Sequence, residues 1–154
     1  MKIKKIISGG QTGVDRAAFD FALENGIEIG GWVPKGRLAE DGVIDRYYTN
    51  LNETATPDYF ERTILNVKDS EATVIISSGK LIGGSLLTRE SAAKFQKPFF
   101  HAELKDSSFI RVVKETKQWL ESTETGILNI AGPRESEDRG IYEKAKAFLT
   151  LLYE

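Results

Sequence analysis

Residues suited to binding an anion lie near the start of the chain, where a short apolar run ends in a glycine-rich turn. The turn consists of Gly9, Gly10, Gln11, Thr12 and Gly13. Strand, glycine turn and helix follow one another in this way in phosphate-binding loops, because glycines let an anion approach the backbone and the helix then offers unpaired N–H groups. The spacing matches neither the dinucleotide-binding nor the Walker fingerprint. The pattern predicts an anion-binding turn, and a tight connection without a ligand is the alternative.

Three later turns follow predicted strands and carry glycines or cations. They contribute Lys35, Gly36 and Arg37, then Gly83, Gly84 and Ser85, and finally Arg134. The second of these turns offers another set of backbone N–H groups ahead of a helix, and the three cations can neutralise a negatively charged ligand. A single surface cation is more often only solvated, so the prediction depends on the four turns meeting at one place.

Other polar and aromatic residues have two interpretations each. Asp15 and Arg16 lie in the first turn of the first predicted helix, where they either contribute to ligand binding or pair with each other or with neighbouring loops. An acidic residue there also stabilises the helix dipole. Tyr47 and Tyr48 belong to the segment 38–57, which has no clear periodicity, and they either stack on a planar heterocycle or hold that segment to the body. A connection of this length predicts a functional or mobile loop.

The composition limits the classes of function. The chain has 154 residues, of which 40% are hydrophobic and 29% charged, as expected for a single domain spanning residues 1–154. A net charge of −2 argues against nucleic acid as a partner. Because the chain has no cysteine and one histidine, we expect neither disulfides nor a metal site. No apolar stretch is long enough to cross a membrane, so we expect a cytoplasmic protein without a membrane partner.

The periodicity of apolar residues predicts alternating strands and helices. Strands are expected at 3–8, 27–33, 71–78, 98–102 and 126–132, and helices at 14–25, 58–69, 86–96, 107–121 and 141–153. Five strands separated by helices predict a mainly parallel sheet covered on both faces, which is a three-layer α/β/α architecture. Since the carboxyl ends of parallel strands lie at one edge, we expect the four turns to line one crevice there.

Several motifs together resemble the molybdenum cofactor carrier family. They are Gly9 to Ala17, Gly31 to Arg37, Glu61-Arg62-Thr63 with Asn66-Val67, Asp69-Ser70, Gly83-Gly84 with Leu87-Thr88, and Gly132-Pro133-Arg134. They follow the family's order over nearly the whole chain. The resemblance implies a Rossmann-like fold, a homo-oligomer, and binding of the molybdenum cofactor (molybdopterin), which is a pterin with a phosphate tail. It implies storage of that cofactor, or its delivery to molybdoenzymes, without turnover, and it adds Thr88 to the expected binding residues.

A wider resemblance links residues 61–90 to the Lonely Guy-type phosphoribohydrolases, which release a base from nucleoside 5′-monophosphates. The matching residues are Arg62, Gly83, Gly84 and Glu90. Ile82 replaces the proline of that family's motif, and two leucines replace its later glycine and threonine. This resemblance makes Arg62 and Glu90 the catalytic candidates, with a carboxylate assisting glycosidic cleavage.

The expected ligand is an anionic small molecule, either a pterin or a nucleotide. A carrier of molybdopterin is the first interpretation of the sequence. A phosphoribohydrolase and a nucleotide-sensing module without catalysis are the two alternatives.

Overall fold

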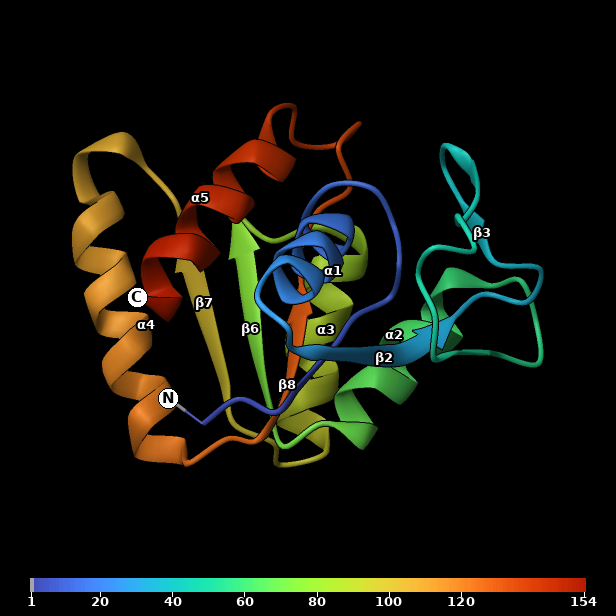
Figure 1. Ribbon diagram of the computed structural model, residues 1–154, viewed down its shortest axis with the longest axis horizontal. Helices are drawn as coiled ribbons and strands as arrows, with labels where there is room; N and C mark the ends of the chain where they lie inside the picture. Colours follow the sequence, from blue (N-terminus) through green and yellow to red (C-terminus); the bar gives the residue numbers. More distant parts are fainter. Residues whose placement is uncertain (1) are drawn as a thin grey trace.

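The computed structural model describes residues 2–154 as a six-stranded sheet between two layers of helices (Figure 1). The strands are β1 (Lys5–Ile7), β2 (Glu28–Val33), β5 (Leu51–Glu53), β6 (Ala72–Ser77), β7 (Phe99–Glu103) and β8 (Ile127–Ala131). They lie in the order β5-β2-β1-β8-β6-β7, and all neighbours are parallel. Two further short strands, β3 (Leu38–Ala39) and β4 (Gly42–Val43), form a separate antiparallel hairpin.

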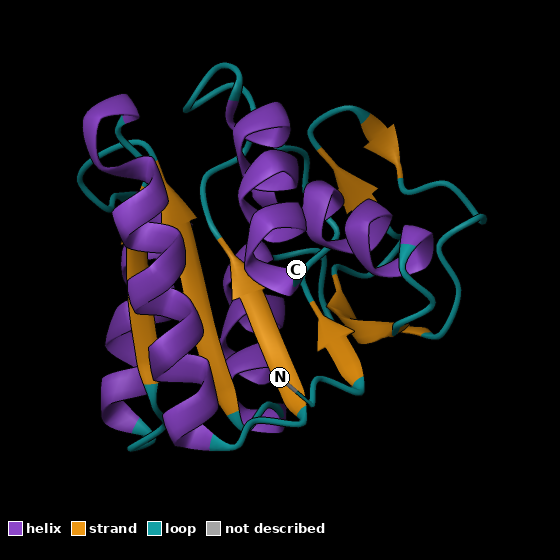
Figure 2. Cartoon of the chain, turned by 60° about the vertical axis from the view of Figure 1, so that its left-hand side comes forward, coloured by secondary structure: helices purple, strands orange, loops and turns teal. Residues whose placement is uncertain are grey.

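Five α-helices cover the two faces of the sheet (Figure 2). They are α1 (Val14–Glu24), α2 (Tyr59–Asp69), α3 (Gly83–Lys94), α4 (Phe109–Thr123) and α5 (Ile141–Tyr153). Helix α5 contacts both α1 and α4 in one layer, while α2 contacts α3 in the other. Together with the parallel sheet, this gives a Rossmann-like three-layer α/β/α fold.

The core forms where apolar strands are covered on both faces. Every residue of β6 is buried, which explains its β-branched run without alternation. Phe19 of α1 and Phe148 of α5 are fully buried. They belong to the same apolar cluster as Ile130 of β8. Burial of these side chains fixes the strand ends that carry the polar turns.

Strand order places the carboxyl ends of three strands side by side. The chain leaves β1 through α1 toward β2 on one side, and it leaves β6 through α3 toward β7 on the other. Strand β8 lies between β1 and β6. In parallel sheets, a crevice opens at the carboxyl edge where successive connections diverge in this way.

The structure contains every strand and helix expected from the periodicity, and it adds elements in the segment 38–57. Strand β5 makes the sheet six-stranded rather than five-stranded, and the β3–β4 hairpin occupies the same segment. These strands have only two or three residues each, which is too short for an alternating pattern to be visible. Helix α3 begins at Gly83 rather than at 86, so Gly83 and Gly84 form its first turn.

The close packing at the end of β8 leads to a prediction about stability. A Cβ atom on Gly132 would lie 2.2 Å from the carbonyl oxygen of Ile76 and 2.5 Å from Cγ2 of Val14. Gly132→Ala should therefore lower the free energy of unfolding by about 1–3 kcal/mol, measured by urea denaturation. Gly79→Ala is the matched control, because a Cβ atom on Gly79 would have no other atom within 4 Å. Equal stability of the two variants would contradict the packing described.

Candidate functional site

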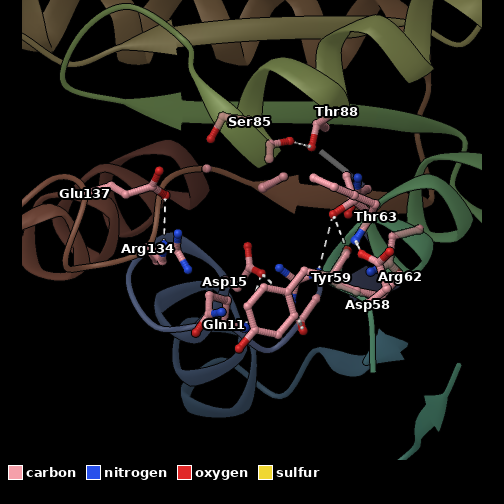
Figure 3. A pocket seen from close by; sticks show the side chains of 18 residues that line it. Gln11, Asp15, Asp58, Tyr59, Arg62, Thr63, Ser85, Thr88, Arg134 and Glu137 are labelled. Atoms are coloured by element: carbon pink, nitrogen blue, oxygen red, sulfur yellow. Dashed lines mark hydrogen bonds and ion pairs between the residues drawn. The ribbon is translucent and has the colours of Figure 1, made fainter. Parts of the chain in front are cut away.

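A cavity of about 400 Å³ opens at the carboxyl ends of β1 and β8, between α2 and α3 (Figure 3). The loop after β1 and the start of α1 contribute Gly9, Gln11 and Asp15. Helix α2 and its cap contribute Asp58, Tyr59, Phe60, Arg62, Thr63 and Asn66, and the first half of α3 contributes Gly83, Gly84, Ser85 and Thr88. Strand β8 and the following turn contribute Asn129, Ala131, Gly132, Arg134 and Glu137.

The first glycine turn uses several of its backbone N–H groups internally. The Gln11 N–H donates to Oδ2 of Asp15 over 3.2 Å, and the Thr12 N–H donates to Oε1 of Gln11 over 3.0 Å. The Val14 N–H reaches the carbonyl oxygen of Pro133 at 3.3 Å. These three donors are therefore engaged by the protein rather than free for a ligand.

A buried ion pair connects α1 to α2 at the base of the cavity. Nη1 of Arg62 donates to the carbonyl oxygen of Gly9 over 2.7 Å and lies 3.9 Å from Oδ2 of Asp15. Both side chains are at most 10% exposed. Burial raises the pKa of Asp15, and the nearby Arg62 charge partly opposes that shift. A Cβ atom on Gly9 would lie 2.7 Å from the Arg62 side chain, so the glycine makes room for the guanidinium stem.

Arg134 and the N-terminal end of α3 lie at the other side of the cavity. Among residues 2–154, no side chain caps this helix, and its first residues, Gly83 and Gly84, are exposed. Arg134 lies nearby with its Nε 3.2 Å from Oε1 of Glu137 (Figure 3). The other carboxylate oxygen of Glu137 lies 3.4 Å from the Cβ position of Gly83. The protein's own carboxylate thus lies beside Arg134 and the positive end of the α3 dipole.

The structure brings part of the predicted binding set together at this cavity. The predicted residues that line it are Gly9, Gln11, Asp15, Arg62, Gly83, Gly84, Ser85, Thr88 and Arg134. Gly10 instead packs against Val33 and Ile44, and Gly13 packs against the backbone around Pro133 and Arg134. Glu90 is exposed on α3 and does not line the cavity.

The predicted cations of the second turn lie outside the cavity. Lys35 is exposed, and the Gly36 N–H donates to Glu53 over 2.7 Å. The Arg37 guanidinium donates to the carbonyl oxygens of Asp45 and Tyr48 over 2.8 and 2.9 Å. Arg37 therefore holds the segment 38–57 in its fold.

Ion pairs and hydrogen bonds attach the β3–β4 hairpin to the first glycine turn. Arg16 forms two hydrogen bonds with the carboxylate of Asp41, at 3.0 and 3.1 Å. The Glu40 carboxylate accepts hydrogen bonds from the hydroxyl groups of Thr12 and Ser136. Thr12 and Arg16 thus hold the hairpin in place rather than facing the cavity.

Tyr48 holds the segment 38–57 to α1. Its hydroxyl group donates to Asp20 over 2.5 Å, and its ring lies 5.6 Å from that of Phe19. Burial and the hydrogen bond to Asp20 raise the pKa of Tyr48. Tyr47 is 67% exposed, and neither tyrosine lines the cavity.

Sequence reasoning missed the aromatic residues of the cavity and Asn129. Tyr59 and Phe60 lie at the start of α2, whose cap Asp58 accepts a hydrogen bond from the Phe60 N–H. The sequence predicts the helix, but α2 is far from the glycine turns along the chain, so the sequence gives no signal that the two lie close together. Asn129 carried a usable signal, because a polar residue interrupts the otherwise apolar strand β8.

Two other kinds of site are absent from the described part of the chain. Within residues 2–154, no helix combines the length and apolar character needed to span a bilayer. Over the same residues, no three His, Asp or Glu side chains are grouped as metal ligands would be.

The raised pKa of Asp15 predicts a pH dependence of stability. The folded protein keeps the Asp15 proton at pH values where the unfolded chain has already released it. The contribution of Asp15 to the free energy of unfolding therefore falls as the pH rises from about 4 through the raised pKa. Urea denaturation at several pH values should show the wild type losing stability relative to Asp15→Asn. A stability difference that stays constant with pH would contradict the burial of this carboxyl group.

Comparisons with known proteins identify the family and support the fold. The family model described as the circularly permutated YpsA SLOG family matches residues 6–153. A crystal structure from Syntrophus aciditrophicus SB, of a protein described as a putative molybdenum carrier protein, is 47% identical in sequence and gives a TM-score of 0.96. The match covers 99% of this chain and 96% of that one. No curated protein matches. The family match extends over nearly the whole chain, and the chain therefore belongs to the circularly permutated YpsA SLOG family.

Proposed function

We propose that the protein binds a small molecule in which an anionic group is joined to a planar heterocycle, and that it carries this molecule without converting it. The observation that carries the proposal is the arrangement of one cavity. Arg134 and the uncapped start of α3 favour an anion at one side, while Tyr59 provides an aromatic surface in the same cavity. A ligand with both parts would satisfy both sides at once.

The molybdenum cofactor is the ligand that we propose within this class. Its phosphate tail suits the start of α3 with Arg134, and its pterin suits Tyr59 and the amide groups of the cavity. The relative from Syntrophus aciditrophicus is described as a putative molybdenum carrier protein, which supports this choice. Because the chain has no cysteine, binding would act on the organic part and the oxo groups of the cofactor rather than through a protein thiolate.

The positions of Glu90 and Asp15 favour a carrier role over glycosidic cleavage. Glu90, the carboxylate that the Lonely Guy-type motif supplies, is exposed outside the cavity. Asp15 does line the cavity, but Arg62 and the Gln11 N–H hold its Oδ2. Homo-oligomer formation and transfer to molybdoenzymes stay predictions. The exposed Phe60 at the mouth of the cavity is an apolar surface that a recipient protein would cover.

Identification of the retained ligand tests this proposal. The protein is purified from a host that makes molybdenum cofactor, denatured, and analysed by mass spectrometry together with pterin fluorescence after acid oxidation. We expect a pterin phosphate to be released from the denatured protein. A nucleotide in its place would keep the binding class and overturn the cofactor assignment. Release of free base from added nucleoside monophosphates would overturn the carrier role.

Arg134 and Glu137, which follow β8 and lie near the start of α3, should have opposite effects on ligand affinity. Arg134→Ala should weaken binding of a phosphate-bearing ligand by roughly tenfold or more, because a charge-assisted hydrogen bond is lost. Glu137→Gln should strengthen binding several-fold, since it removes a carboxylate that repels the incoming anion. Titration calorimetry measures both, with Lys114→Ala as a control for an exposed lysine on α4. Weaker binding by Glu137→Gln would contradict this placement of the anion.

A further inference from the structure

We infer that Asp15 and Gln11 together recognise a 2-amino-4-oxopyrimidine edge, the hydrogen-bonding pattern shared by pterins and guanine. This inference rests on the proposed function, because it specifies the heterocycle of the ligand that the cavity binds. The contacts of Asp15 and Gln11 within the protein leave some of their hydrogen-bonding positions unused.

Gln11 has a buried hydrogen-bond donor without a partner. The residue is only 4% exposed, and among residues 2–154 no acceptor reaches its Nε2. Its Oε1 accepts from the N–H groups of Thr12 and Glu40, at 3.0 and 2.8 Å. Because two backbone donors identify the oxygen, the other atom of the amide must be the NH₂ group. Buried polar groups are nearly always paired, so this donor points to a missing acceptor.

Asp15 places an acceptor next to this donor. The Gln11 N–H lies 3.2 Å from Oδ2 of Asp15, so the two side chains start from the same short turn. Both line the cavity, and Figure 3 shows them together at the end away from Ser85 and Thr88. A carboxylate has about four acceptor positions, and its Oδ2 contacts with Gln11 and Arg62 leave capacity for a ligand.

A carboxylate beside an amide donor favours heterocycles whose edge carries the matching donors and acceptor. A 2-amino-4-oxopyrimidine presents a ring N–H and an adjacent amino group to a carboxylate, and its neighbouring carbonyl oxygen can accept from an amide NH₂. Adenine presents a single amino group beside a ring nitrogen and leaves part of the carboxylate unpaired. Burial raises the pKa of Asp15, and two ligand N–H donors would compensate the ionised carboxylate for its lost hydration.

The β3–β4 hairpin positions the Gln11 donor. The Glu40 N–H that binds Oε1 of Gln11 belongs to the turn of this hairpin, and the Glu40 carboxylate is held by Ser136 over 2.5 Å. Arg16 fixes the next residue, Asp41, by two hydrogen bonds. The amide of Gln11 is therefore set in one orientation before the ligand arrives, which lowers the entropic cost of using it.

Titration calorimetry with defined probes tests the inference on the full chain. The probes are GMP, IMP, AMP and a pterin monophosphate, all carrying one phosphate. IMP lacks only the 2-amino group of GMP, so the ratio of their affinities reports the contact with Asp15. We expect wild-type protein to bind GMP or the pterin monophosphate roughly tenfold tighter than IMP and AMP. A preference between GMP and the pterin identifies which source of the shared edge the protein uses.

Two variants separate recognition from a structural role. Asp15→Asn should reduce the GMP to IMP affinity ratio to near one, because the amide keeps one accepting oxygen and replaces the other with an NH₂ group that cannot accept the ligand's 2-amino N–H. Gln11→Glu keeps an oxygen for the N–H groups of Thr12 and Glu40 but replaces the donor. It should weaken GMP and IMP, which both carry the carbonyl group, relative to AMP. Gln118→Glu on the exposed face of α4 is the matched control.

The outcomes distinguish this inference from the proposed function. Equal affinities for GMP, IMP, AMP and the pterin monophosphate in wild-type protein would overturn the inference and leave the binding class intact. Unchanged ratios in both variants would overturn it as well. No binding of any of the four probes would overturn the inference and the proposed function together. If Asp15→Asn does not fold, the affinity ratios of the wild-type protein and of Gln11→Glu still test the inference.

Discussion

The buried contact between Asp15 and Arg62 is the constraint on which the cavity depends. Arg62 reaches across from α2 to the carbonyl oxygen of Gly9 and to the carboxylate of Asp15, which lies in the first turn of α1. It thereby fixes the start of α2, with Tyr59, over the end of β1. Removing either side chain would leave the other one buried without this partner. The pair thus holds together two helices from opposite faces of the sheet.

This contact also determines the polarity of the cavity. The carboxylate of Asp15 makes the first glycine turn a poor place for an anion, and the N–H groups of Gln11 and Thr12 are already engaged. The start of α3 has no side-chain cap and lies near Arg134. A ligand with a negative group and a flat ring therefore has one favourable orientation, in which the negative group lies toward α3 and the ring lies toward Asp15 and Tyr59.

The sequence allowed the layered fold and the meeting of two glycine turns to be predicted, because β-branched runs and helical periodicity are local signals. It did not reveal which backbone groups of the first turn are free, since that depends on contacts such as Gln11 with Asp15. Arg37 resembles a ligand-binding cation in sequence, yet it binds carbonyl oxygens of its own segment. Tyr59 became visible as a wall of the cavity only through the long-range contact of Arg62 with Gly9, which spans 53 residues.

A crystal structure of the protein with a bound phosphate-bearing heterocycle would test the central claim most directly. The measurement is the orientation of the ligand in the cavity. We expect the phosphate at the N–H groups of Gly83 and Gly84 beside Arg134, and the ring between Tyr59 and the carboxylate of Asp15. A phosphate bound at the turn from Gly9 to Gly13, with the ring toward α3, would contradict this claim.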